Sequence, residues 1–140
     1  EWEWALALMV TSVACRISPD VFMCNSVISA CEKGRRWELA IQLLELMRDR
    51  GMRPNVVSFN AVISASEKCD EWAQALHFLQ QMHADKVAAD VISYSAAISA
   101  CAKTLHWEHA LFLLRAMELQ GVPPDVIIYN AAISACEKGL

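Results

Sequence analysis

Apolar and polar positions along this chain follow a pattern that returns every 35 residues. In one stretch, apolar side chains stand three or four residues apart, at Trp37, Ala40, Ile41, Leu44 and Met47. This spacing places them on one face of an α-helix. The same stripe follows Trp72 and Trp107, each 35 residues further on. A strict period of this length is typical of stacked repeat proteins, in which each copy buries its apolar face against its neighbours.

Each period is predicted to hold two helices. The first helices are expected at Val21–Lys33, Val56–Lys68, Val91–Lys103 and Val126–Lys138. A short polar residue precedes each one and is suited to accept hydrogen bonds from free backbone N–H groups; these are Asp20, Asn55, Asp90 and Asp125. The second helices begin near the tryptophans, which are expected to fill space beside a small alanine. Gly34 is expected to form the turn between the two helices, and Gly51 and Gly121 to end second helices.

The predicted fold class is all-α: an α-solenoid of stacked two-helix, 35-residue repeats that form a right-handed superhelix with a groove. Three complete units are expected, at residues 21–55, 56–90 and 91–125. Residues 1–20 would supply the second helix of a preceding unit, and residues 126–140 the first helix of a following one. We therefore expect one continuous solenoid that is a piece of a longer array.

At this level the chain resembles the pentatricopeptide repeat family. The likeness is carried by the first helices, VFMCNSVISACEKG, VVSFNAVISASEKC, VISYSAAISACAKT and VIIYNAAISACEKG, and by returning halves such as WELAIQLLELMRDRGMRPN. It covers the entire chain. The related tetratricopeptide repeat has a period of 34 residues and a different signature.

Composition and motifs exclude several other classes. Apolar residues make up 56% of the chain, but no apolar run approaches the ~20 residues that a membrane-spanning helix needs. The four histidines lie off the repeated pattern, and no catalytic arrangement is visible, so we expect no enzyme activity. None of the six cysteines forms a CxxC pair, so neither a metal site nor a cofactor is expected. Cys31, Cys101 and Cys136 share one register with Ser66, which favours a small residue at a tight helix contact.

One face of the first helices is polar within an otherwise apolar frame. It presents Asn25, Asn60, Ser95 and Asn130 at equivalent positions. Asn and Ser are unfavourable inside helices by roughly 0.5 kcal/mol relative to Ala, so their recurrence indicates a role besides folding. The alternative is a set of polar side chains that simply face water.

The resemblance implies that these residues bind single-stranded RNA, one base per repeat. In the family, the Asn or Ser position and the last residue of the same repeat together select the base. The pairs here would be Asn25 with Asn55 for cytosine, Asn60 with Asp90 for uracil, and Ser95 with Asp125 for guanine, and Asn130 has no partner in the chain. Apolar side chains at the second position of each repeat would sandwich the bases, namely Phe22, Val57, Ile92 and Ile127. The chain would then read 5′-C-U-G-3′.

A second regular stripe consists of the lysines Lys33, Lys68, Lys103 and Lys138. Lysines in register are suited to follow a phosphate backbone, but they also suit the negative end of a helix dipole. Glutamates precede three of them, and the net charge is −4, whereas RNA-binding domains are usually basic. The local charge of the groove decides between these roles.

These observations favour sequence-selective binding of single-stranded RNA. By resemblance, the protein would act in a mitochondrion or plastid, on the processing, stability or translation of transcripts, with no direct membrane insertion. Its partners would be RNA and other proteins of an organellar ribonucleoprotein or membrane complex. The alternative is a structural scaffold subunit that holds proteins or ribosomal RNA in a large organellar assembly.

Overall fold

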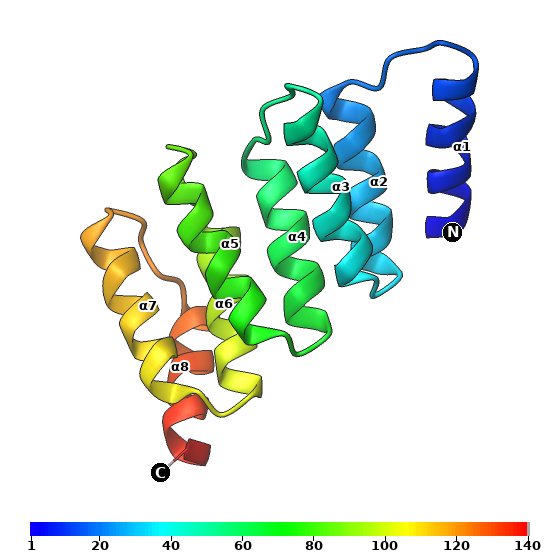
Figure 1. Ribbon diagram of the computed structural model, residues 1–140. Helices are drawn as coiled ribbons and strands as arrows, with labels where there is room; N and C mark the ends of the chain where they lie inside the picture. Colours follow the sequence, from blue (N-terminus) through cyan, green and yellow to red (C-terminus); the bar gives the residue numbers. More distant parts are fainter. Residues whose placement is uncertain (140) are drawn as a thin grey trace.

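The computed structural model describes residues 1–139 and contains eight α-helices in this range (Figure 1). They are α1 (Trp2–Ala14), α2 (Val21–Lys33), α3 (Trp37–Asp49), α4 (Val56–Lys68), α5 (Trp72–Ala84), α6 (Val91–Lys103), α7 (Trp107–Leu119) and α8 (Val126–Gly139). Leu140, the last residue of the predicted final unit, lies outside the described residues. The predicted all-helical solenoid is confirmed, whereas the boundaries drawn between repeats stay a prediction.

The predicted first helices begin and end where the sequence placed them, except that α8 runs one residue further, to Gly139. Each begins because a side chain caps its free backbone N–H groups. Asp20 accepts from Met23 N at 2.8 Å, and Asp125 accepts from Ile128 N at 2.9 Å. At α4 and α6 the bond is reciprocal, since a serine hydroxyl also accepts from the N–H of the cap residue.

Glycine ends two of the second helices as predicted, with Gly51 at φ 75° and Gly121 at φ 76°. Lys86 takes the same left-handed conformation in the middle unit, at φ 59°, which is less favourable for a residue with a side chain. Gly34 lies in the predicted turn, but its φ is −81° and Arg35 carries the positive φ, so this turn does not depend on the conformational freedom of glycine. A Cβ on Gly34 would lie 2.2 Å from Cδ1 of Trp2, so glycine is needed there for close packing.

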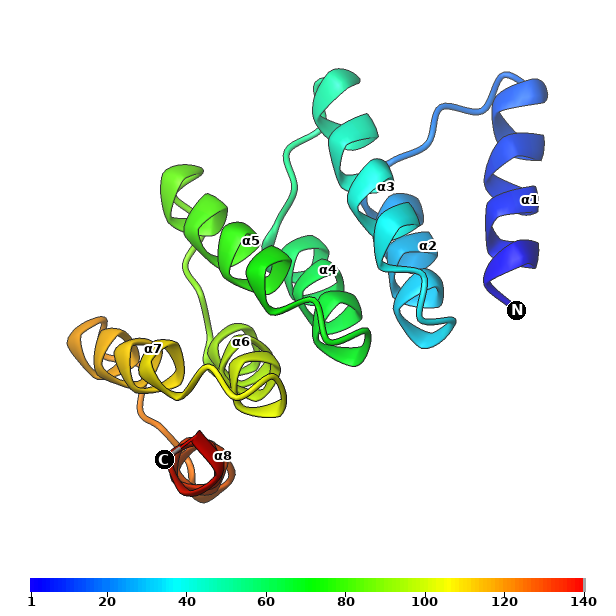
Figure 2. The same cartoon turned by 60° about the horizontal axis from the view of Figure 1, so that its bottom comes forward.

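The helices form two layers that follow a curve (Figure 2). The first helices α2, α4, α6 and α8 pack against one another in sequence and lie on the concave side. The second helices each pack on first helices but not on one another. The first helices are therefore the continuous layer that faces the groove. No helix among residues 1–139 is both long and apolar enough to cross a bilayer.

The core runs between the two layers as a continuous strip. Ile28, Ile63 and Ile98 are fully buried at equivalent positions. The tryptophans are only half-buried, so the prediction that they fill core space holds in part. Trp72 stacks on His106 of the next unit, with ring centroids 3.7 Å apart. The tryptophans thus contribute to contacts between units at the rim of the core.

Candidate nucleic-acid interface

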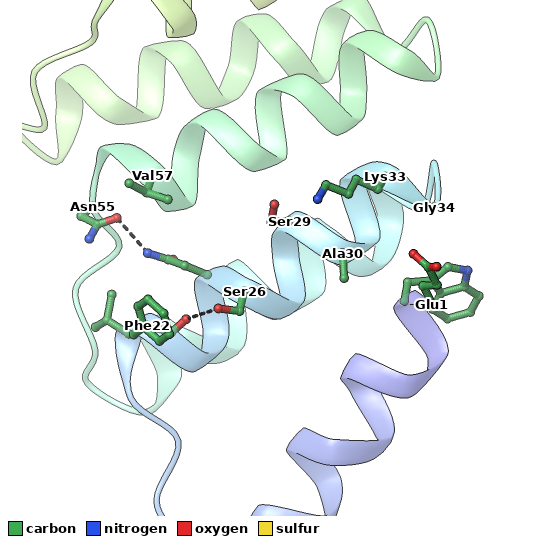
Figure 3. Close-up of a pocket in the computed structure, with 12 residues that line it drawn as sticks. Glu1, Phe22, Ser26, Ser29, Ala30, Lys33, Gly34, Asn55 and Val57 are labelled. Carbon is green, nitrogen blue, oxygen red and sulfur yellow. Dashed lines mark hydrogen bonds between the residues drawn. The ribbon is translucent and has the colours of Figure 1, made fainter.

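A groove of about 970 Å³ lies along α2, between α1 and the start of α4 (Figure 3). It brings together five of the residues singled out in the sequence, which are Phe22, Asn25, Lys33, Asn55 and Val57. Phe22 and Asn55 stand near one end of α2, and Lys33 stands at the other end beside Gly34. Ser29, between them, also lines the groove. The predicted base-reading, sandwiching and phosphate residues of the first complete unit therefore share one surface.

The four predicted sandwich residues are large apolar side chains that remain exposed. Phe22 is 78% exposed, and Val57, Ile92 and Ile127 are each more than half exposed. Each is the second residue of a first helix, so the four stand in register along the concave layer. Covering an exposed apolar side chain with a flat apolar partner lowers the free energy, because apolar surface is removed from water. Their regular spacing suits a ligand with flat groups at regular intervals.

Asn25 and Asn55 form a hydrogen-bonded pair at one end of the groove (Figure 3). Asn25 Nδ2 donates to Asn55 Oδ1 at 3.1 Å. The hydroxyl of Ser58, on α4, donates to Asn25 Oδ1 and accepts from Asn55 N. Asn25 is only 8% exposed, so it is not a polar residue that simply faces water. It is a nearly buried side chain with an edge on the groove.

The second unit repeats this arrangement. Asn60 Nδ2 donates to Asp90 Oδ1 at 3.1 Å, and the hydroxyl of Ser93 donates to Asn60 Oδ1. Burial alone would raise the pKa of the Asp90 carboxyl, but hydrogen bonds from Ser93, Asn60 and Ile92 outweigh it and lower that pKa. Asp90 is therefore ionised at neutral pH and offers only acceptors.

The third unit differs. Asp125 caps α8 through Ile128 N, but no hydrogen bond joins it to Ser95 within residues 1–139. Ile128 occupies the position of Ser58 and Ser93 and has no hydroxyl to donate. Asn130 is exposed on α8. The structure thus links the first two predicted pairs and leaves the third unlinked.

The lysine stripe divides into two kinds. Lys68 Nζ lies 2.8 Å from Glu32 Oε1, which also accepts from the hydroxyl of Ser64 at 2.9 Å. Lys103 pairs with Glu67 in the same way, and Ser99 donates to that carboxylate at 3.0 Å. Among the described residues, neither Lys33 nor Lys138 forms an ion pair. Ala102 stands where a glutamate would face Lys138, which explains the difference for that lysine.

The remaining candidate side chains, the histidines and cysteines, form no site of their own within residues 1–139. Within residues 1–139 no three His, Cys, Asp or Glu side chains are grouped so as to hold a metal ion. Cys31, Cys101 and Ser66 are fully buried, as their shared register predicted, whereas Cys136 in the same register is half-buried. Burial raises the pKa of the Cys101 thiol to about 11, so it is unreactive near neutral pH.

Sequence reasoning missed the partners of two sets of residues, and these partners lie in a neighbouring unit. The first is the pair of capping serines, Ser58 and Ser93, whose hydroxyls reach the asparagine of the preceding unit. The second is the pair of glutamates that bind the lysines of the following unit. Constant separations of 33 residues from Asn to Ser and 36 from Glu to Lys were available as signals. Only the stacking of units shows that these separations are contacts.

Comparison with protein families and solved structures identifies relatives of this arrangement. The profile of the PPR repeat family matches residues 19–66 and 54–103, and a PPR repeat profile matches residues 92–122. The structure is similar to pentatricopeptide repeat protein PPR10 in complex with an 18-nucleotide psaJ RNA element, with 27% identity and a TM-score of 0.84. That match covers 97% of this chain and 20% of the other.

Two further structures show the same architecture. PPR10 from maize, at 27% identity, matches with a TM-score of 0.75 over 98% of this chain and 20% of its own. The PPR domain of Arabidopsis thaliana protein-only RNase P 1, in complex with tRNA, matches with a TM-score of 0.88 over 98% and 72%. At 16% identity the latter likeness shows the fold alone. A search of curated proteins by sequence found no match. The chain spans about a fifth of the PPR10 structures.

Proposed function

The chain belongs to the pentatricopeptide repeat family, and from that premise we propose that it binds single-stranded RNA along the concave layer of first helices, with about one base per repeat. The observation that carries this proposal is the groove on α2. There a hydrogen-bonded pair, Asn25 and Asn55, lies beside two apolar side chains, Phe22 and Val57, and Lys33 stands further along.

Each part of this groove suits a different part of a nucleotide. Single-stranded bases expose flat faces and their Watson–Crick edges, and proteins recognise them by packing on the faces and hydrogen-bonding to the edges. Phe22 and Val57 offer apolar surface to the faces of a base. Asn25 and Asn55 offer polar groups to its edge, and Lys33 offers a positive charge to a phosphate.

The proposed order of recognition is 5′-C-U-G-3′, from the pairs Asn25–Asn55, Asn60–Asp90 and Ser95–Asp125. The proposal is supported by the family membership and by the likeness to PPR10, which has been solved with RNA. The chain is proposed to act as a binding module rather than an enzyme. Its proposed site of action, a mitochondrion or plastid, rests on the family resemblance alone, as does its role in RNA processing, stability or translation.

Base selection is tested by exchanging one member of a pair. Ser95→Asn leaves Asp125 in place and should shift the preference of the third unit from guanine to uracil, by about 1–3 kcal/mol if base contacts here resemble those in DNA complexes. Binding of parent and variant to RNAs that end in G or U would be compared by NMR titration. Equal affinity of both proteins for both RNAs would refute the assignment of bases to pairs.

One observation favours a second function, that of a protein or ribosomal RNA scaffold. Glutamates neutralise Lys68 and Lys103, and the chain has a net charge of −4, so the layer of first helices is less positive than its four lysines imply. Crosslinking of the purified chain to RNA, with no other protein present, distinguishes RNA binding from a scaffold that holds proteins. RNA binding predicts a crosslink at the groove, and a protein scaffold predicts none.

A further inference from the structure

We propose that Ser58 and Ser93 determine which edge Asn25 and Asn60 present to an RNA base. Each serine hydroxyl donates a hydrogen bond to the side-chain carbonyl oxygen of the asparagine in the preceding unit. This bond would turn the side-chain N–H groups of the asparagine toward the groove. The two serines would therefore be positioning residues for base selection, although they touch no base themselves. This inference rests on the proposed function.

The position of Ser58 fixes what its hydroxyl does. Ser58 is the third residue of α4 and is fully buried. Its oxygen accepts a hydrogen bond from Asn55 N at 3.1 Å. A hydroxyl has a single proton to donate, and the nearer acceptor is Asn25 Oδ1 rather than Asn55 Oδ1. The proton is thus directed at Asn25.

Most hydrogen-bonding groups of the Asn25 side-chain amide then have a partner. Its Oδ1 accepts from Ser58, and one Nδ2 proton goes to Asn55 Oδ1. An amide has two N–H donors, so one remains for a ligand. A flipped amide would turn its oxygen toward Asn55 Oδ1, which already serves as the helix cap. It would also turn its nitrogen toward the Ser58 hydroxyl, which could accept from it only by giving its own proton to Asn55 Oδ1 instead, so the hydrogen bond between Asn25 and Asn55 would be lost.

The same accounting gives each unit a distinct pattern of donors and acceptors. In the first unit, Asn55 uses Oδ1 for the cap and for Asn25, which leaves its Nδ2 for a ligand. Asn25 and Asn55 therefore offer two donors, which complement the adjacent acceptors N3 and O2 of cytosine. In the second unit, Asp90 replaces the second donor by a carboxylate oxygen. Asn60 and Asp90 offer one donor and one acceptor, which complement a carbonyl and the N3–H of uracil.

The third unit provides a contrast within the same chain. Ile128 occupies the serine position and is buried, so the fold accommodates an apolar β-branched side chain there. Ser95→Asn alone would introduce an asparagine at position 95, but Ile128 has no hydroxyl that could donate to its side-chain carbonyl. We expect Ser95→Asn combined with Ile128→Thr to prefer uracil over cytosine about fivefold more strongly than Ser95→Asn alone, the worth of one net hydrogen bond.

The test compares two variants of nearly equal shape, Ser58→Thr and Ser58→Val. Both side chains are β-branched, but only threonine has a hydroxyl. Affinities of the 140-residue chain for RNAs with C or U at the first position would be measured by NMR titration. We expect Thr to retain the preference for C over U and Val to reduce it about fivefold. Ser66→Ala is the matched control, because Ser66 is a buried serine of the same helix that bonds only to Val62 O; its preference should equal that of the parent.

A second measurement needs no RNA. Hydrogen exchange of the Asn25 side-chain amide should be about fivefold faster in Ser58→Val than in Ser58→Thr, because one of the bonds that hold the amide is lost. Equal exchange in the two variants would overturn the proposal. So would an unchanged preference for C over U in the Val variant when the parent chain discriminates. If the parent binds no RNA, the proposed function fails, and the exchange rates alone decide whether Ser58 holds the amide.

Discussion

Salt dependence of RNA binding is predicted to separate the four lysines of the stripe into two pairs. Lys68 and Lys103 already face the carboxylates of Glu32 and Glu67, so a phosphate that approaches them meets a neutralised charge. Lys33 and Lys138 form no ion pair among the described residues. We therefore expect Lys33→Gln and Lys138→Gln to reduce the salt slope, and Lys68→Gln and Lys103→Gln to change it little.

The magnitude follows from counterion release. A single-stranded nucleic acid contributes about 0.7 to the slope of log K against log salt for each phosphate that is neutralised. Two effective lysines give a slope of about 1.4, and four give about 2.8. Between 50 and 200 mM salt, affinity would then fall about sevenfold with two lysines but about fiftyfold with four. These outcomes are well separated in a titration by fluorescence anisotropy.

A matched variant tests the role of the carboxylate. Glu32→Gln retains the shape of the side chain but releases Lys68, and should raise the slope by about 0.7. The stability of the chain should change by at most about 1 kcal/mol, because the pair is partly exposed. The reasoning is refuted if Lys68→Gln flattens the slope as much as Lys33→Gln does, or if Glu32→Gln leaves the slope unchanged.

Three further outcomes are expected. Trp72→Ala should lower the free energy of unfolding in urea by about 2 kcal/mol, less than for a core tryptophan, because Trp72 is half-buried; no loss relative to Trp4→Ala, a change at a mostly exposed side chain, would contradict this. Because folding lowers the pKa of the Asp90 carboxyl, this residue should stabilise the fold at pH values above 3.8, its ordinary pKa. The stabilisation should be lost as the pH falls through the pKa of the folded state. Uracil preference of the second unit should accordingly stay constant between about pH 8 and pH 5, and a loss near pH 6 in binding assays would show otherwise. Cys101 should resist thiol reagents at about pH 8 while exposed Cys15 reacts, and mass spectrometry showing equal labelling would disprove that Cys101 stays buried.

The sequence predicts the helices well because their signals are local. A capping residue such as Asn55 acts on N–H groups a few residues away, and the apolar stripe after Trp37 needs only the helical period. Contacts between units are a different matter. Ser58 reads locally as part of a capping box, and nothing near it indicates a bond to Asn25, which lies 33 residues earlier.

The same reason explains the remaining differences. Glu32 was recognised as a charge that opposes the lysine stripe, but its partner is Lys68, in the next unit, rather than its neighbour Lys33. The sequence predicts Gly34 as a turn residue, but it does not show that the absence of a side chain is needed for contact with Trp2, 32 residues away. How deeply Trp72 is buried depends on the spread of the outer helices, which no single unit determines.

The bridges between units have a consequence for how such a protein evolves. Ser58 reaches back to Asn25, and Lys68 reaches back to Glu32, so each bridge joins a unit only to its nearest neighbour. A gene duplication that adds 35 residues therefore creates a junction whose partners are already in place, and no compensating substitution is needed. Under the proposed function, one such event lengthens the recognised RNA by one base. The junction between residues 91–125 and 126–140 lacks both bridges, because Ala102 replaces the glutamate and Ile128 replaces the serine, and copying residues 91–125 would copy the loss of the lysine bridge.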